Sequence, residues 1–329
     1  MAIGKTSDFK IYDELMHTGY TETVQQFTEA FNEASNGAIA LVSEAKIGEY
    51  EKEAFYDALS APISRQDITS VSAQTDRNLT QDENIRVKLH RKFDSTAVTK
   101  KQFKMIGRDP GEFFMVLGEQ YAKDAAREKL DTGLAAARAA LANTSNLLND
   151  ITGASVTSIT HTNLLRTLGK FGDASDRIVA WVMHSTQFFD LGVQSIADQI
   201  ETVASGVIRS FNVAGFNRPI IVTDSASLIA TADTPDSYFV LGLSRNAIQL
   251  IESEAPEFLQ DEVSGLEQIV MRYQGEYAYN LGVKGYKWDT TNGGANPSDS
   301  AVATGSNWDA AATSDKDKAG VVLKCQAAS

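Results

Sequence analysis

The sequence predicts an α+β fold, because helices and strands are both indicated but do not alternate as they do in a parallel α/β sheet. One long helical pattern begins near Pro110 and runs to about Asn143. A polar, β-prone stretch precedes this helix, and short apolar strands separated by turns follow it. Helices and strands therefore share the predicted core.

The N-terminal stretch is acidic and carries a modest helical pattern. Thr21 is a candidate cap for a helix on which Val24, Phe27 and Phe31 recur at spacings of three and four. The Asn-Gly pair that begins at Asn36 is a typical helix stop. We therefore expect one short helix in this stretch.

Between Ile63 and Ile106 the sequence is polar and favours strands. The alternation from Ile85 to His90 predicts a strand with one apolar face, in a long hairpin or an extended loop. The region is also basic, with Asp94 as the opposing charge among its bases. These bases are Arg86, Lys88, Arg91, Lys92, Lys100, Lys101, Lys104 and Arg108.

Charge is thus segregated along the chain, since the segment before the basic region is acidic. Segregation permits an electrostatic contact between the basic region of one copy and an acidic surface of another, which favours self-association. A solvated charged face is the alternative interpretation.

The helix that opens at Asp109-Pro110 has its proline near the first turn, where the missing backbone N–H is tolerated. At 1.5 Å per residue it would be a rod of about 50 Å. Its apolar residues fall on two different sides along its length. They are Phe113, Phe114, Leu117 and Tyr121 on one side, and Leu130, Leu134, Ala137 and Leu141 on another. Two helices broken at Asp131-Thr132-Gly133 are the alternative, because glycine is a poor interior helix residue.

Beyond Thr152 the pattern is mixed. A buried strand is predicted at Ile178–Met183, and Ser185 is a candidate cap for the next helix. The other predicted elements are a helix at 163–171, strands at 219–223, 238–244, 267–273 and 276–288, a helical segment at 246–252, and a strand at 321–323.

Composition excludes several classes of protein. The net charge of -13 argues against tight wrapping of nucleic acid, which needs clustered lysine and arginine, but a container that encloses DNA without gripping it is allowed. No apolar run approaches the roughly 18 residues of a membrane helix, so we expect synthesis in the cytoplasm and no membrane contact. A single cysteine, Cys325, cannot form an intrachain disulfide.

Catalytic and cofactor motifs are missing from the sequence. The four histidines lack metal-ligand spacing, and no glycine-rich phosphate-binding motif occurs, so no cofactor, metal or catalytic residue is expected. His184, Ser185 and Asp190 could suggest a hydrolase, but neighbours in a chain point in different directions and a triad must converge in space. The structural interpretation is that His184 ends a strand and Ser185 begins a helix.

Three segments, in this order, resemble the HK97-fold capsid proteins of tailed bacteriophages. The first is the apolar strand Ile178–Met183 with His184, Ser185 and the aromatic Phe188. The second, Arg218–Asp224, is similar to the family's G-x-P-V-x-V-x-D strand, although Arg218 stands where glycine is frequent. The third is Tyr238–Gly242.

This resemblance implies an HK97-like capsid fold and a division of the chain. The divisions are 1–60, an N-terminal arm; 61–108, an extended loop; 109–155, a spine helix and the start of a peripheral domain; 156–270, mainly an axial domain; and 271–329, a return to the peripheral domain with the C-terminal segment. The implied function is a major capsid protein whose hexamers and pentamers form the icosahedral shell of a virion around double-stranded DNA, without sequence-specific binding.

The resemblance also implies partners: a separate scaffolding protein, a portal and a possible decoration protein. We expect Arg86, Lys88, Arg91 and Lys92 to face an acidic neighbouring subunit. Phe113, Leu117 and Tyr121 would form the packed side of the spine, and we expect them to take part in the contact between subunits as well. The alternatives are an encapsulin-like nanocompartment shell and, more remotely, the soluble hydrolase.

Overall fold

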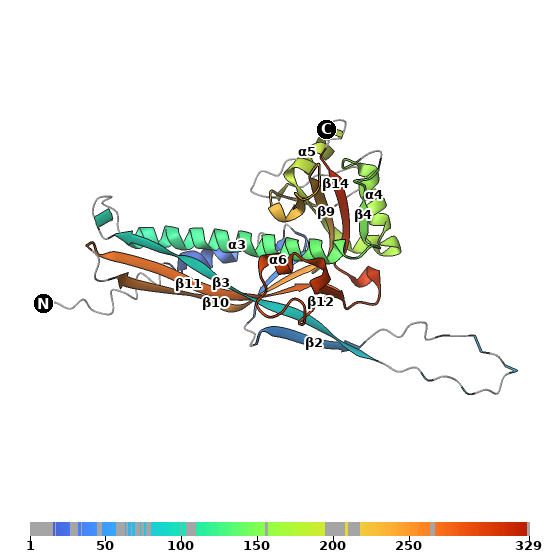
Figure 1. Ribbon diagram of the computed structural model, residues 1–329, viewed down its shortest axis with the longest axis horizontal. Helices are drawn as coiled ribbons and strands as arrows, with labels where there is room; N and C mark the ends of the chain where they lie inside the picture. The colour runs from blue at the N-terminus through green and yellow to red at the C-terminus, as the bar shows by residue number, and fades with distance from the viewer. Residues whose placement is uncertain are drawn as a thin grey trace.

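Two sheets and one long helix organise the chain in the computed structural model (Figure 1). The structure describes residues 16, 18–26, 32–33, 35–44, 48–56, 63, 65–66, 68–69, 73, 76, 80–99, 101–102, 110–154, 157–194, 208–209, 218–263 and 267–327. Its main helices are α3 (Pro110–Ala142), α4 (His161–Gly169), α5 (Ser185–Gln194) and the short α6 (Asp299–Val302).

A long, twisted sheet lies along one side of α3 (Figure 1). In spatial order its strands are β1 (Ile39–Ser43), β10 (Ile248–Val263), β11 (Val270–Val283), β3 (Gln81–Thr99) and β2 (Tyr50–Tyr56). β1 pairs with β10 in parallel, and the other neighbours are antiparallel. The beginning of β3 therefore pairs with β2, whereas its remainder pairs with β11.

A second, more compact sheet lies beyond the C-terminal half of α3 (Figure 1). In spatial order its strands are β4 (Leu148–Asp150), β14 (Gly320–Gln326), β9 (Ser237–Ser244), β5 (Ile178–His184), β7 (Ile220–Thr223) and β6 (Ile208–Arg209), with β8 (Ile229–Ala230) on β9. A small ribbon joins β12 (Tyr286–Trp288) to β13 (Trp308–Ala310). The last strand of the chain thus returns to the compact sheet.

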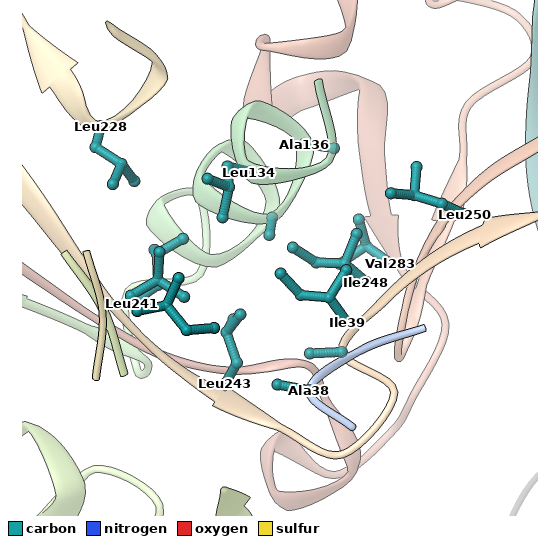
Figure 2. Packing of buried hydrophobic residues seen from close by; sticks show 14 of the residues in the cluster. Ala38, Ile39, Leu134, Ala136, Leu228, Leu241, Leu243, Ile248, Leu250 and Val283 are labelled. Atoms are coloured by element: carbon teal, nitrogen blue, oxygen red, sulfur yellow. The ribbon is translucent and has the colours of Figure 1, made fainter. Parts of the chain in front are cut away.

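The prediction of one unbroken helix is confirmed, because α3 runs through Gly133 without interruption. A Cβ atom at Gly133 would lie 2.9 Å from Cγ2 of Ile248, so glycine is required for the close approach of β10 rather than for a break. Figure 2 shows Leu134 between Leu241 of the compact sheet and Ile248 and Ile39 of the long sheet. The second apolar side of α3 therefore packs where both sheets meet.

The first apolar side of α3 packs on an aromatic cluster in the long sheet. The rings of Tyr121 and Phe93 are stacked with centroids 4.9 Å apart, and Phe258 lies 5.3 Å from Phe93. Gly275 on the strand between them has no side chain, and a Cβ there would lie 2.6 Å from the Phe258 ring. Different layers thus cover the two ends of the helix, as its two apolar sides predicted.

The predicted helical segment at 246–252 is wrong, because residues from Ile248 onward form β10. Ile248 and Leu250 are buried while Gln249 between them is partly exposed, which is the period of two that a strand requires. The segment pairs with β1 on one side and β11 on the other. Tertiary pairing has overridden local helix propensity here.

Two boundaries near the C-terminus also differ from prediction. The strands expected at 267–273 and 276–288 are one strand, β11, followed by a turn at Gly285 with a φ of 77° and then β12. The expected strands at 178–183, 219–223 and 238–244 are confirmed as β5, β7 and β9 within a residue or two.

The N-terminal helix begins ahead of its expected cap. Residues 18–26 are helical, so Thr21 lies inside the helix, and Phe27 and Phe31 lie outside the described residues. The expected stop is confirmed: Asn36 and Gly37 both have positive φ, at 52° and 71°.

Successive parts of the chain alternate between the two sheets. β10 and β11 belong together to the long sheet, and β14 belongs to the compact one. Chain order cannot reveal this exchange, because strand pairing joins segments far apart in sequence. The names peripheral and axial, and the division that they imply, stay predictions.

Candidate inter-subunit contact site

β3 carries the four basic residues that the sequence placed against a neighbouring copy. Successive side chains of a strand point to opposite faces of the sheet. Arg91 contacts α3, so it lies on the covered face, and Arg86, Lys88 and Lys92 lie on the opposite face. The four residues therefore do not form one continuous surface.

Arg86 is surrounded by polar groups of its own chain. Its Nη1 lies 3.0 Å from Glu51, its Nη2 lies 3.2 Å from Glu53, and its Nε donates to Gln249 at 2.8 Å. Its stem lies over Gly282, where a Cβ would be 2.8 Å from Cγ of the arginine. From β3, the guanidinium therefore contacts β2 on one side and reaches across β11 to β10 on the other.

Lys88 is one of the few buried cations of the described chain. Its side chain is 5% exposed, and Nζ lies 2.5 Å from Glu254 of β10. This hydrogen bond from Lys88 is the leading cause that lowers the pKa of the Glu254 carboxyl. A buried charge needs such a partner, since its desolvation is otherwise costly.

Arg91 connects the sheet to the long helix. Its Nε lies 2.8 Å from Glu128 of α3, and its Nη2 lies 2.5 Å from Asp299 at the start of α6. Glu128 also accepts hydrogen bonds from the hydroxyls of Tyr277, at 3.0 Å, and Tyr279, at 2.9 Å. Burial first, and then the Glu128 charge, raises the pKa of both phenols, so both remain donors.

Lys92 differs from the other three bases. Its side chain is 82% exposed, and its Nζ lies 3.5 Å from Asp94, whose side chain is 92% exposed. Such a surface pair contributes little to stability. Of the four bases, Lys92 is therefore the most accessible to another molecule.

The three spine residues have different surroundings. Leu117 is buried in the core, and Tyr121 is partly buried, stacks on Phe93 and shares a hydrogen bond of 2.7 Å with Thr96. The side chain of Phe113 lies outside the described part. Leu117 and Tyr121 thus pack within the subunit, and their contact with a neighbour stays a prediction.

Sequence reasoning missed the polar centre formed by the partly buried Glu128 and the buried Tyr277 and Tyr279. Glu128 looked like one more charged residue on a long helix. The alternation of Met271, Tyr273, Tyr277 and Tyr279 along β11 was the available signal, because it predicts one face of buried aromatics whose hydroxyls need acceptors.

The hairpin formed by β2 and β3 projects from the body of the subunit (Figure 1). Among the described strands, residues 81–86 of β3 pair with β2 alone. Large apolar side chains are exposed on and beyond this ribbon: Tyr56 at 65%, Ile63 at 90% and Ile68 at 89%. The projection therefore offers both charge and apolar surface to another molecule.

His184 and Ser185 do not form a catalytic arrangement. Nδ1 of His184 accepts a hydrogen bond of 3.2 Å from the backbone N–H of Thr186, and lies 3.1 Å from the hydroxyl of the same residue. The imidazole thus satisfies the first turn of α5, which was the role predicted for Ser185. Nε2 of His184 lies 3.9 Å from Asp224.

Neither a metal centre nor a membrane span is found in the described part of the chain. Its histidine, cysteine and carboxylate side chains do not gather into a group that could hold a metal ion. None of its helices combines the length and apolar character needed to cross a membrane.

Several solved capsid structures share this arrangement of sheets and spine helix. The Cyanophage Pam1 capsid subunit has a TM-score of 0.56 at 12% identity, covering 88% of each chain. The capsid of Ralstonia phage GP4 has a TM-score of 0.56 at 11% identity, covering 90% of this chain and 88% of that one. The acid-stable capsid of Helicobacter pylori bacteriophage KHP30 has a TM-score of 0.53 at 13% identity, covering 89% of each. No curated protein sequence matches the chain.

The fold is that of the subunits from which tailed-phage capsids are built, and it is consistent with the HK97-like fold that the resemblance implied. The sequence profile of one capsid family, described as major capsid protein 13-like, matches residues 8–322, and the chain belongs to this family. The protein is therefore a structural shell protein of a phage capsid, and its family and fold are not those of an enzyme. Capsids are assembled from many copies of such a subunit.

Proposed function

We propose that this chain forms the icosahedral head shell of a tailed phage through hexamers and pentamers, and encloses double-stranded DNA without sequence-specific contacts. Synthesis takes place in the host cytoplasm, before assembly. The net charge of -13 supports an enclosing role, because a surface of the same sign as DNA does not adsorb it.

The observation that carries the proposal is the projecting hairpin. A two-stranded ribbon is marginally stable by itself in water, and this one exposes Tyr56, with Ile63 and Ile68 exposed in the segment that follows β2. A second copy of the chain would cover such a projection in a closed shell, where identical subunits meet through unlike surfaces. The nanocompartment alternative has no comparable support, because the family and the similar structures are phage capsids.

Within this shell we assign the neighbour-facing basic role to Lys92 first. Arg86, Lys88 and Arg91 each have carboxylate partners in their own chain, so a second carboxylate from a neighbour would join an existing pair. Lys92 has an exposed ammonium and a weak partner. Charge reversal, Lys92→Glu, should slow assembly and reduce its dependence on salt, because rim charges act mainly on association rates.

A separate scaffolding protein, a portal and a possible decoration protein complete the proposed assembly. The scaffolding protein would direct curvature during assembly, and the portal would occupy one vertex. A capsid protein that by itself makes uniform shells of correct size would remove the need for the scaffolding partner.

The test is assembly of the recombinant chain, expressed with and without the scaffolding protein from the same genome. Size-exclusion chromatography and negative-stain electron microscopy should show shells, or free capsomers of five and six subunits. A monodisperse monomer or dimer under every condition would overturn the proposal.

A further inference from the structure

The base of the β2–β3 hairpin is held by a segment from the opposite end of the chain. Figure 1 shows β12 beside β3, close to the point where β2 and β3 project beyond the body, and the two strands pack together. Because residues 81–86 of β3 pair with β2 alone, the sheet itself does not fix the direction of the ribbon. Besides Arg86, whose guanidinium reaches Gln249 of β10, contacts from outside the sheet can do so.

Three polar contacts join this segment to successive points along β3. Nζ of Lys287 donates to both carboxylate oxygens of Asp82, at 2.8 and 3.0 Å. The Asn296 side-chain oxygen accepts from the backbone N–H of His90 at 3.1 Å. Asp299 accepts from Arg91, whose Nε also faces Glu128 of α3. The contacts are spread over ten residues of the strand, so together they oppose rotation of the ribbon.

The segment that makes these contacts is itself rigid. The rings of Trp288 and Trp308 meet edge to face with centroids 4.9 Å apart, and both indoles are fully buried. Nε1 of Trp288 donates to the carbonyl of Gly294, and a Cβ at Gly293 would collide with the Trp288 ring. Asp289 accepts hydrogen bonds from two backbone N–H groups of the same turn. The loop is therefore wrapped tightly around a buried tryptophan.

We propose that residues 287–299 act as a clamp that sets the direction in which the β2–β3 hairpin leaves the subunit, and so positions it for contact with a neighbouring copy. The second half of this statement rests on the proposed function. Lys287 and Asp82 are positioning residues in this account: they touch each other, not the neighbour. Of the three contacts, their two hydrogen bonds lie nearest the free end of the ribbon. They therefore restrict its direction more than contacts closer to the body do.

The direction of the hairpin can be measured by a distance between two spin labels. Ala54→Cys on exposed β2 and Lys123→Cys on an exposed site of α3 provide the positions. The native thiol, Cys325, is buried and donates to the Gln187 side-chain oxygen, and burial raises its pKa to about 12, so it takes up little label. Labelled chains diluted into unlabelled ones report the distance within one subunit by double electron–electron resonance.

We expect one narrow distance distribution in the parent chain and a broader or displaced one in Lys287→Met. Lys52→Met is the matched control, because Lys52 forms a 3.0 Å pair with Glu83 inside the hairpin, and its loss should leave the direction unchanged. The exchange Asp82→Lys with Lys287→Asp should restore the narrow distribution. Identical distributions for Lys287→Met and the parent chain, or failure of the exchange to restore it, would overturn the clamp.

A second readout tests the link to assembly. By electron microscopy, Lys287→Met should give a smaller yield of closed shells than Lys52→Met, and the charge exchange should recover the yield. Parental yields from a variant with a broadened distribution would overturn the positioning role. Absence of shells from the parent chain would instead refute the proposed function, and the distance measurement on the clamp would stand independently.

Discussion

Arg91 of β3 and Glu128 of α3 meet at 2.8 Å and join the spine helix to the middle of the long sheet. The same carboxylate accepts hydrogen bonds from Tyr277, Tyr279 and Thr132, so its oxygens are well satisfied under the helix. The next residue of the helix, Lys129, donates a hydrogen bond of 2.7 Å to Glu252 of β10. The helix is thus attached to three adjacent strands by charged groups as well as by apolar packing.

Coupling between these two residues should be measurable in a double-mutant cycle. Arg91→Met, Glu128→Gln and the double variant should give a coupling energy of about 1 kcal/mol, within the 0.5–3 kcal/mol typical of contacting charged residues. Both side chains are partly exposed, so the effect stays below the 3–5 kcal/mol of a fully buried pair. Thermal unfolding of unassembled subunits is the measurement.

The exposed pair of Arg127 and Asp124, 3.9 Å apart, serves as the control and should show no coupling. A coupling energy of zero between Arg91 and Glu128 would contradict a stabilising contact between β3 and α3.

Gly133→Ala should destabilise the subunit although alanine is the better helix former. Helix propensity favours alanine by about 1 kcal/mol. The new Cβ, however, would lie 2.9 Å from a branch of buried Ile248, and overpacking of a core typically costs about 1–3 kcal/mol. The expected net result is a lower Tm. Gly169→Ala at the end of α4, where a Cβ has nothing within 4 Å, should leave Tm unchanged or raise it. A higher Tm for Gly133→Ala than for the parent chain would show that β10 can shift to accommodate the new Cβ without cost.

Cys325 should be unreactive in the folded subunit. Burial, and then the charge of Asp190, raises the pKa of its thiol from 9.0 to about 12. The raised pKa means that this group adds stability below about pH 9, and that the contribution is lost as pH rises toward 12. At pH 8 the thiol should react with an alkylating reagent more than about a hundredfold slower than the same thiol in unfolded chain, because the thiolate is the reactive form. Ala54→Cys on exposed β2 should react at the unfolded rate. Equal rates for Cys325 and that exposed thiol would contradict the burial of β14.

Acid should loosen the clamp on the hairpin. The hydrogen bonds from Lys287 are the largest cause that lowers the pKa of Asp82 below its ordinary value near 3.9. A lowered pKa means that the contribution is fully present above that ordinary value, and that it is lost as pH falls through the lower pKa of the folded state. The label distance across the hairpin should therefore be constant from pH 7 to about 5 and broaden only as the pH falls through this lowered pKa. In Asp82→Asn the distribution should already be broad at pH 7. A distribution that is narrow at pH 7 in that variant would argue against a charge-dependent contact.

Much of the compact sheet could be predicted from the sequence, because its strands are short apolar runs. Residues 178–183 and 238–244 are almost continuously apolar, as expected for strands buried on both faces. The long helix could also be predicted, since its proline start and two apolar sides are local features. Its passage through Gly133 without a break depends on Ile248, which is distant in sequence.

The long sheet was harder to predict because its strands are polar on one face and pair over large separations. Ile248 and Leu250 were read as part of a helix, although they alternate with partly exposed neighbours in β10. The same difficulty applies to the basic residues of β3. Sequence showed the segregation of charge, but it could not show that Glu51, Glu254 and Glu128 of the same chain would lie beside these bases.

A cryo-electron microscopy reconstruction of the particles formed by the full chain would show how neighbouring subunits meet. We expect capsomers of five and six subunits in a closed shell, with each β2–β3 hairpin lying against a neighbouring copy and Lys92 within reach of a carboxylate of that copy. Particles in which every hairpin contacts its own subunit alone, or preparations that never form capsomers, would contradict this expectation.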